Sequence, residues 1–217
     1  MFRTSFFLDA TAPFVHTGEA AARHIKRLHP AVRGFVQTRA TVDQIGDAAP
    51  AFSGVAELWF DTPELAHIAC KAGYPLQGLI SDGASVARRS VGLERSVMLM
   101  PSFRRGSGIK GVFPFGKKKG QRVEDFQNHW WHRHGPIAAL TEGASAYIQC
   151  HPMPYLYSIA EPPFDGITEI WWSDVATARA AMKSRQMTED QSNDAKNFAE
   201  PGTVLLFLAQ EEVVIAP

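Results

Sequence analysis

Residues 52–60, FSGVAELWF, and residues 164–172, FDGITEIWW, align with each other without a gap. The match extends to residues 34–60 and 146–172 at a constant offset of 112 (169 minus 57). A period this long that occurs twice is not a solenoid repeat, and it indicates a duplicated small domain. Each half is then a control for the other. Residues that the fold needs should occur in both halves, and residues that occur in one half are better candidates for chemistry.

Each half has the pattern strand, helix, strand, strand, helix, strand. In the first half these elements are predicted at residues 3–8, 18–28, 34–40, 55–60, 63–72 and 96–100. In the second half they are predicted at residues 109–115, 123–140, 146–151, 167–172, 175–183 and 203–208. We align the last strands as residues 96–100 on residues 203–207. The glycine-rich stretch at residues 101–108 is the predicted linker.

This order of elements is the split βαβ arrangement of ferredoxin-like domains, in which four antiparallel strands carry two helices on one face. The opposite face of each sheet is expected to be apolar and must be buried. The sheet of the second copy is the layer that we expect to bury it. We therefore predict an α+β fold in which two ferredoxin-like βαββαβ units, residues 1–103 and 104–217, form a dimeric-α/β-barrel-like pseudo-dimer within one chain.

Composition narrows the class of protein. The formal net charge of zero gives no reason to expect nucleic acid or a membrane surface as a partner. The apolar runs are too short for a secretory signal or a membrane span, so we expect a cytoplasmic protein. The two cysteines, Cys70 and Cys150, do not occupy matching positions, and we expect free thiols. The expected partner is a small-molecule substrate, and a homodimer of the single-chain barrel stays open.

Three motifs follow one another in the second half: Phe126-x-x-x-Trp130-x-x-x-His134-Gly135-Pro136, then Tyr147-x-Gln149-x-His151, then Phe164-Asp165-Gly166-x-x-Glu169-x-Trp171. In combination they resemble the EthD family of dimeric α/β-barrel proteins, over most of residues 109–217. The resemblance implies the fold, and it implies an activity among cofactor-free monooxygenases, lactone isomerases, polyketide cyclases, dehydratases and, further out, haem-binding enzymes. Since this fold hosts many activities, the resemblance does not indicate which of them this chain has.

The first half departs from these motifs. It has Arg39 in the column of His151 and Ser53 in the column of Asp165, and His24 lies two places from the column of the helix histidine. We therefore interpret the first half as a degenerate copy that supplies structure. A second site built from His24, Arg39 and Glu57 stays an open alternative.

The helix that begins near residue 123 carries a candidate base. At 100° per residue, one stripe that faces the sheet holds Val123, Phe126, Trp130, His134 and Ile137. His134 is thus either a hydrogen-bonded core histidine or a catalytic one. His129 and His132 have ligand spacing but lie on the polar face with no third ligand in view, so no metal site is expected.

On the following strand, Tyr147, Gln149 and His151 alternate onto one face. Buried polar groups need partners, so this face either lines a ligand-filled cavity or ends in a solvent-exposed His151. Glu169 lies among apolar neighbours and is expected to have a raised pKa or a hydrogen-bonded partner. Its counterpart Glu57 in the first half favours a structural role or a paired site used twice.

The favoured hypothesis is a cofactor-independent lyase or isomerase that acts on a small aromatic or polyketide-like molecule by histidine acid–base catalysis. Catalysis is assigned to His134, His151, Tyr147, Glu169 and Asp165, although Asp before Gly is first a turn signal. Substrate binding is assigned to Trp130, Gln149, Trp171, Arg39, Glu57 and His24. No cofactor and no metal are expected. The competing hypotheses are a haem-linked or cofactor-free oxygenase and a non-catalytic small-molecule-binding protein.

Overall fold

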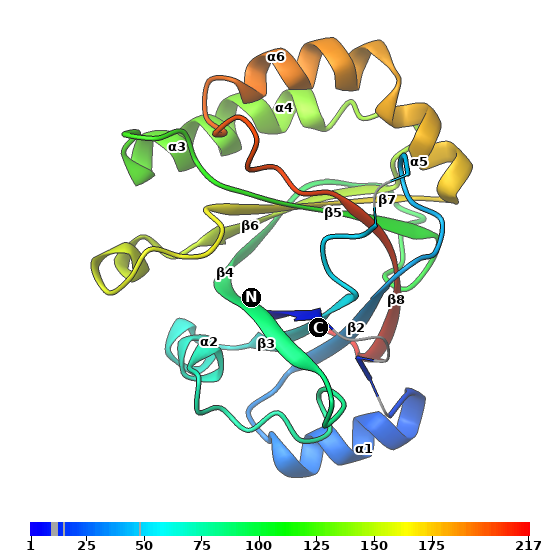
Figure 1. Ribbon diagram of the computed structural model, residues 1–217, viewed down its shortest axis with the longest axis vertical. Coiled ribbons are helices and arrows are strands. Elements are labelled where there is room, and N and C mark those ends of the chain that lie inside the picture. The colour runs from blue at the N-terminus through cyan, green and yellow to red at the C-terminus, as the bar shows by residue number, and fades with distance from the viewer. Residues whose placement is uncertain (10–12, 15, 48) are drawn as a thin grey trace.

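The computed structural model describes residues 1–9, 13–14, 16–47 and 49–217, and its strands close into one antiparallel barrel (Figure 1). The strands are β1 (Phe2–Asp9), β2 (Gly34–Ala40), β3 (Gly54–Phe60), β4 (Ser85–Leu99), β5 (Ile109–Phe115), β6 (Ala146–Pro152), β7 (Gly166–Trp172) and β8 (Phe207–Ile215). The α-helices are α1 (Gly18–Leu28), α2 (Pro63–Cys70), α3 (Val123–His129), α4 (Gly135–Ala138), α5 (Val175–Met182) and α6 (Ser192–Ala195). Two π-helices, η1 (Trp130–His134) and η3 (Gln186–Gln191), and a 3₁₀-helix, η2 (Pro154–Ser158), complete the elements.

The strand order around the barrel is β1-β3-β2-β8-β5-β7-β6-β4. Each half therefore has the ferredoxin-like order, β4-β1-β3-β2 and β8-β5-β7-β6, and the β2–β8 and β4–β6 pairings join the halves. Helices α1 and α2 lie on one side of the barrel, and α3 to α6 lie on the other (Figure 1). The predicted α+β fold of two ferredoxin-like units is confirmed.

Equivalent helices of the two halves begin in the same way. The Thr62 side chain accepts a hydrogen bond from the Leu65 N–H at the start of α2, at 3.3 Å. Asp174, which is 112 residues further on, accepts from the Thr177 N–H at the start of α5, at 2.7 Å. Both side chains satisfy amide groups that a helix start leaves unpaired, so the duplication preserves the caps as well as the strands.

The last strand of each half differs from its prediction. Strand β4 begins at Ser85, eleven residues before the predicted start (96 minus 85). The sequence did not indicate this earlier part of the strand, because Arg88, Arg89 and Glu94 interrupt the alternation of apolar and polar residues. Arg3 in the first half pairs with Gly92 of β4, and Lys110 in the second half pairs with Ala209 of β8. Gly92 therefore corresponds to Ala209, and Glu94, two residues on, corresponds to Glu211. The alignment of residues 96–100 on residues 203–207 is wrong.

The centre of the barrel is charged, whereas we predicted an apolar face. We call the following buried and half-buried residues the barrel cluster: Arg3, Glu57, Trp59, Glu94, Arg105, Lys110, Glu169, Trp171 and Glu211. The Lys110 Nζ lies 2.7 Å from both Glu57 and Glu169, and 3.0 Å from Glu211. The Arg3 guanidinium contacts Glu57, Glu94 and Glu169. Buried charges are tolerated when opposite charges meet them, and here each half supplies partners to the other.

The barrel cluster follows the two-fold repeat of the chain. The Trp59 Nε1–H donates to Glu94 at 3.2 Å, and the Trp171 Nε1–H donates to Glu211 at 2.8 Å. Burial and the neighbouring Glu169 charge raise the pKa of Glu57 to about 7. Burial opposes ionisation of Glu169 as well, but the charges of Arg3 and Lys110 outweigh it and hold the pKa of Glu169 below its usual value. The two equivalent glutamates therefore differ in protonation near neutral pH.

Candidate functional site

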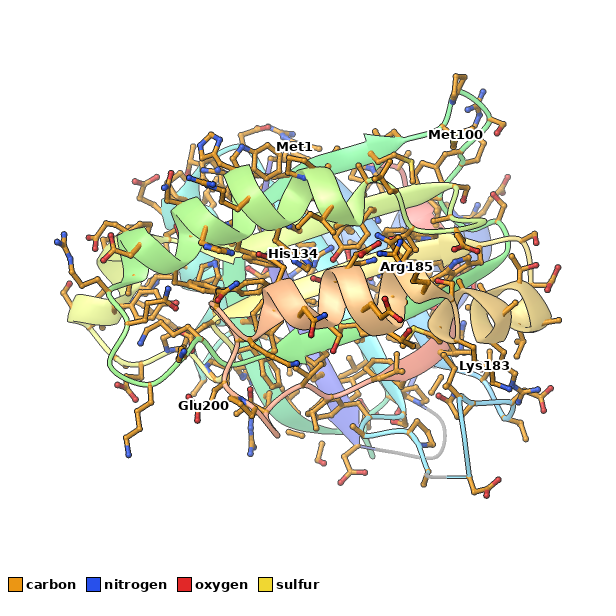
Figure 2. The ribbon with its side chains drawn as sticks, turned by 90° about the horizontal axis from the view of Figure 1, so that it is seen from above. Met1, Met100, His134, Lys183, Arg185 and Glu200 are labelled. Carbon is orange, nitrogen blue, oxygen red and sulfur yellow. The ribbon has the colours of Figure 1, made fainter. Side chains whose placement is uncertain are left out.

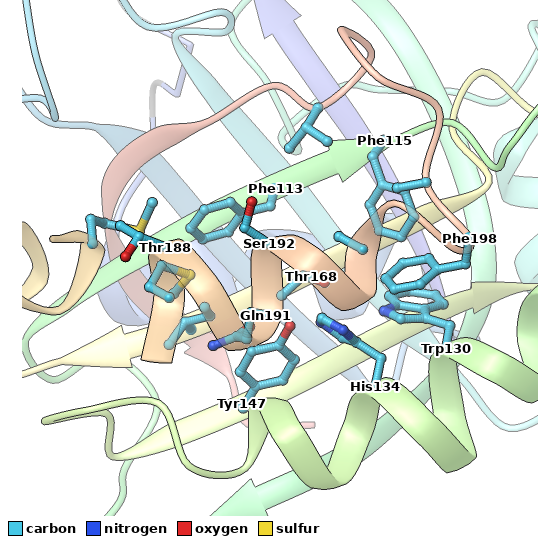
Figure 3. A pocket seen from close by; sticks show the side chains of 16 residues that line it. Phe113, Phe115, Trp130, His134, Tyr147, Thr168, Thr188, Gln191, Ser192 and Phe198 are labelled. Carbon is cyan, nitrogen blue, oxygen red and sulfur yellow. The ribbon is translucent and has the colours of Figure 1, made fainter. Parts of the chain in front are cut away.

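A cavity of about 440 Å³ lies on the outer face of the C-terminal sheet, beneath the helices that cover it. Its floor consists of side chains from β5, β6 and β7, and its roof comes from η1 and from the η3–α6 segment (Figure 3). Five aromatic side chains line it: Phe113, Phe115, Trp130, Tyr147 and Phe198. The polar side chains that reach it are His134, Thr168, Thr188, Gln191 and Ser192.

His134 is the histidine that lines this cavity. Figure 2 shows it between the α3–α4 helix and α6, and Figure 3 shows its ring among the side chains that line the cavity. The His134 Nδ1 lies 2.9 Å from the Asp194 Oδ2, and the ring packs edge-on against Phe198 with centroids 4.8 Å apart. Because a carboxylate only accepts, Nδ1 carries the proton and Nε2 is left as a free acceptor.

The protonation of His134 is set by two opposing effects. Burial lowers the pKa of His134, and the hydrogen bond and charge of Asp194 offset only part of this effect. The imidazole is therefore neutral at physiological pH. A neutral imidazole with a bare Nε2 is the form that can take a proton.

Asp194 was missed by the sequence reasoning. It lies on α6, and its second oxygen, Oδ1, is 3.0 Å from the His129 Nε2. The pKa of Asp194 is lowered despite partial burial, because His129 and His134 both hydrogen-bond to it. The η3–α6 segment follows α5 and has no counterpart after α2. Comparison of the two halves beyond residue 183 would have marked this insertion as a candidate for chemistry.

The helix above the cavity changes its winding at the site. Phe126, Trp130 and His134 are buried as predicted, but Ala138 replaces Ile137 in the buried stripe. The reason is the π-helical turn at η1, which adds a residue to the turn and shifts the phase of everything that follows. A period of 3.6 residues could not have predicted this shift.

Tyr147 faces the cavity from β6 (Figure 3). Burial raises the pKa of Tyr147, and a hydrogen bond with Thr168 offsets part of that effect. The phenol therefore stays protonated and can donate a hydrogen bond. Gln191 is held in place, since its Nε2 donates to the Thr141 Oγ1 at 2.9 Å and to the Gln186 Oε1 at 2.8 Å.

His151 and Gln149 share a strand face with Tyr147 but are not among the residues that line the cavity. The His151 ring stacks on the Trp130 indole with centroids 4.2 Å apart, and its Nε2 lies 2.9 Å from the Gln149 Oε1. The Gln149 Nε2 donates to the Trp130 carbonyl at 3.2 Å. Burial, with a smaller contribution from Arg95, lowers the pKa of His151 to about 3, so it is neutral and a weak base. His134 and His151 thus lie in different surroundings.

The remaining candidates lie elsewhere. Glu57, Glu169 and Trp171 belong to the barrel cluster on the opposite face of the sheet. Asp165 holds a turn: its Oδ2 accepts from the Lys117 N–H at 2.8 Å, and its Oδ1 accepts from the Tyr157 hydroxyl at 2.7 Å.

Arg39 and His24 are not brought together with Glu57. Arg39 pairs with Glu212 at 3.2 Å on the surface between β2 and β8, and the His24 ring on α1 packs against His16 at 5.0 Å. None of these three side chains lines the cavity that His134 borders.

Three further features are the metal-ligating side chains, the length of the helices and the cysteines. Among the described residues, no group of three or more His, Cys, Asp or Glu side chains is arranged to hold a metal ion. Over the same residues, no helix has the length and apolar character needed to cross a membrane. Cys70 and Cys150 are free thiols.

Most of the residues that line the cavity lie in a segment that matches a known family model. Residues 118–202 match the family model of the EthD domain. No curated protein matches the chain. A solved EthD family protein from Bacillus halodurans is 18% identical over 46% of this chain and 94% of its own, with a TM-score of 0.37.

Two more solved structures extend over nearly the whole chain. An anthrone oxidase-like protein is 10% identical over 98% of this chain and 92% of its own, with a TM-score of 0.57. A dye-decolorizing peroxidase from Bacteroides thetaiotaomicron is 10% identical over 96% of this chain and 92% of its own, with a TM-score of 0.50. At these identities the likeness concerns the fold, which both halves of the chain share with these proteins.

Proposed function

Because residues 118–202 match the EthD domain, we propose that the cavity in this part of the chain is the active site of a cofactor-independent lyase or isomerase. The substrate is a small, neutral, aromatic or polyketide-like molecule. One observation carries the proposal: His134 borders an aromatic cavity, and its Nδ1 lies 2.9 Å from the Asp194 carboxylate. Since the carboxylate accepts, this contact assigns the ring proton to Nδ1 and leaves Nε2 as the acceptor. This is the arrangement of a general base whose imidazolium form is stabilised by a carboxylate.

The reaction begins with transfer of a proton to the His134 Nε2 from a carbon that is next to a carbonyl group or conjugated with it through an aromatic ring. The electron pair of the broken C–H bond moves onto the carbonyl oxygen, and Asp194 stabilises the imidazolium that forms. The Tyr147 hydroxyl lines the same cavity and donates a hydrogen bond to the developing oxyanion. Return of the proton to another carbon gives isomerisation, and its transfer to a leaving group gives elimination. Ring closure uses the same enolate, whose carbon attacks a second carbonyl group of the substrate. Decarboxylation would need a carboxylate substrate, for which the described lining holds no cation, so this step is not assigned.

The lining favours a neutral and flat substrate. Neither Lys nor Arg is among the described residues that line the cavity, so it offers no counterion for a carboxylate or phosphate. Its volume of about 440 Å³ is in the range of small-molecule sites, which span roughly 300–1,000 Å³. The aromatic walls supply stacking surfaces for a flat substrate.

We propose that His134, Asp194 and Tyr147 carry out the proton transfer and that Trp130 forms a wall of the substrate site. No chemical step is assigned to His151, Glu169 or Asp165, since none of them lines the cavity. His151 and Gln149 instead support the Trp130 ring from behind, through stacking and a hydrogen bond to its carbonyl.

A haem-linked activity fits this cavity less well. The hydrogen bond that the His134 Nδ1–H donates to Asp194 would suit an axial histidine, but the described lining holds no cation to pair with the carboxylates of a haem. An absorbance scan of the purified protein near the Soret region tests for haem. Oxygenation without a cofactor is separated from the proposal by its requirement for oxygen, and binding without turnover is separated from it by a turnover assay.

Anthrone is a suitable first probe, because the solved structure described as anthrone oxidase-like has the same fold and because anthrone is a neutral tricyclic ketone with an acidic methylene group. The assay follows exchange of the methylene hydrogens in D₂O under nitrogen by NMR. We expect the protein to accelerate exchange, and His134→Gln and Asp194→Asn to slow it by about a hundredfold or more.

The matched control is His132→Gln, which removes an exposed histidine from the same helix and should leave exchange unchanged. Undiminished exchange in His134→Gln would remove the acid–base mechanism. Tight binding of anthrone with no acceleration in the native protein would favour the non-catalytic binding protein.

A further inference from the structure

Asp194 is shared by two histidines that face different surroundings. Its Oδ2 lies 2.9 Å from the His134 Nδ1, and its Oδ1 lies 3.0 Å from the His129 Nε2. The His134 side chain is 6% exposed and borders the cavity, whereas the His129 side chain is 26% exposed. His129 borders a separate polar cleft at the surface. One carboxylate therefore connects the interior cavity with a residue that solvent reaches.

The π-helical turn explains how both histidines reach one carboxylate. His129 and His134 are five residues apart, and in an α-helix residues five apart lie on different sides of the axis. In a π-helix the backbone bonds join residues five apart, so these residues lie almost above one another. The turn at η1 lies between the two histidines. Phe198 packs against both rings, at 5.6 Å and 4.8 Å, and holds them beside α6.

The charged groups around the pair are few. Asp194 is the group that faces both rings from α6. On the helix of the histidines themselves, Asp125 and Arg133 border the surface cleft together with His129. Tyr147 lines the cavity with His134 from the sheet and stays a neutral phenol. A proton that arrives on His129 from solvent thus acts on His134 chiefly through the carboxylate that both share.

We propose that His129 is a positioning residue of the cavity base, which fixes the orientation of Asp194 and transmits the charge state of the surface to His134. The inference rests on the proposed function of His134. When His129 is neutral, its Nε2–H donates to Asp194 and leaves the full carboxylate charge to stabilise an imidazolium on His134. When His129 is protonated, it neutralises that charge, and His134 becomes a weaker base.

The direction of this effect agrees with the electrostatics of His134. After burial and the opposing contribution of Asp194, the charge of His129 is a further influence that lowers the pKa of His134. A neutral group at position 129 that still donates to Asp194 should therefore raise the pKa of His134. Loss of the Asp194 charge should lower it.

The test is an NMR pH titration of the His134 side chain in the full-length protein without substrate. His129→Gln keeps an N–H donor near Asp194 and removes the charge, and we expect the His134 midpoint to rise by roughly half a pH unit or more. Asp194→Asn should lower it by a similar or larger amount. His132→Gln removes an exposed histidine ring two residues from His134 and should leave the midpoint unchanged.

An unchanged His134 midpoint in His129→Gln, with the expected shift in Asp194→Asn, would overturn the role of His129. No shift in either variant would overturn the shared carboxylate as well. Since the titration needs no substrate, these outcomes are separate from failure of the proposed function, which is read from anthrone exchange. In that assay, the acidic limb of the pH profile should move to higher pH in His129→Gln if both proposals hold, because a base with a raised pKa takes up its proton earlier as the pH falls.

Discussion

The barrel cluster predicts that removal of a charge at Glu57 stabilises the protein at neutral pH. Glu57 ionises near 4.5 in an unfolded chain and near 7 in the folded protein, because burial and Glu169 oppose its charge. Between these values the folded state holds a proton that the unfolded state has lost. The stability that Glu57 contributes is therefore complete below about pH 4.5 and is lost as the pH rises towards 7.

The size of the effect follows from the gap between the two values (7 minus 4.5). At about 1.4 kcal/mol for each pH unit, Glu57 weakens folding by about 3 kcal/mol between pH 4.5 and pH 7.5. Glu57→Gln copies the protonated side chain and can keep the hydrogen bond with Thr38. Its stability should equal that of the native protein near pH 4.5 and exceed it by about 3 kcal/mol at pH 7.5.

Urea unfolding followed by tryptophan fluorescence, at pH values from 4.5 to 7.5, measures this difference directly. Taking the difference between variant and native protein cancels the buried histidines, whose lowered pKa values give a slope of the opposite sign. Parallel stability curves for the two proteins, with no divergence above pH 5, would refute the proton on Glu57 and the reasoning about the cluster.

Three further predictions concern the same architecture. Glu169→Gln should destabilise the protein at pH 7 by about 3–5 kcal/mol in the same urea assay, because Arg3 would lose a buried counterion; equal effects at positions 57 and 169 would contradict their difference in protonation. His151→Phe should keep the stack on Trp130 and leave anthrone exchange within about threefold of native, and a hundredfold loss would return His151 to the chemistry. Ala195→Trp should fill the cavity and abolish anthrone binding by fluorescence quenching while the circular dichroism spectrum is retained; undiminished binding would place the ligand elsewhere.

The architecture could be predicted because it depends on features that repeat. Strand alternation, helix caps and the 112-residue offset each occur twice, so one half checks the other. The first part of strand β4 was not predicted, because its charged residues, which face the barrel cluster or solvent, interrupt the apolar alternation. The charge of the barrel centre could not be predicted, since Glu57 is tolerated only through cations that come from distant strands, Arg3 and Lys110.

The site could be predicted in part. His134 and Tyr147 follow from helical and strand periodicity, and both line the cavity. The separation of His151 from the cavity depends on the bulk of Trp130, which periodicity does not describe. Predicting Asp194 as part of the site would have required knowing that the η3–α6 segment folds back over the sheet. Its only signal in the sequence is that this segment is absent from the first half.

The most direct test of the account is the ¹⁵N NMR spectrum of the His134 ring at pH 7, with and without anthrone. The account predicts a neutral ring that carries its proton on Nδ1, against Asp194, and a change in the Nε2 resonance when anthrone binds. A proton on Nε2, a permanently charged ring, or an Nε2 signal indifferent to bound anthrone would contradict the claim that His134 is the base of this cavity.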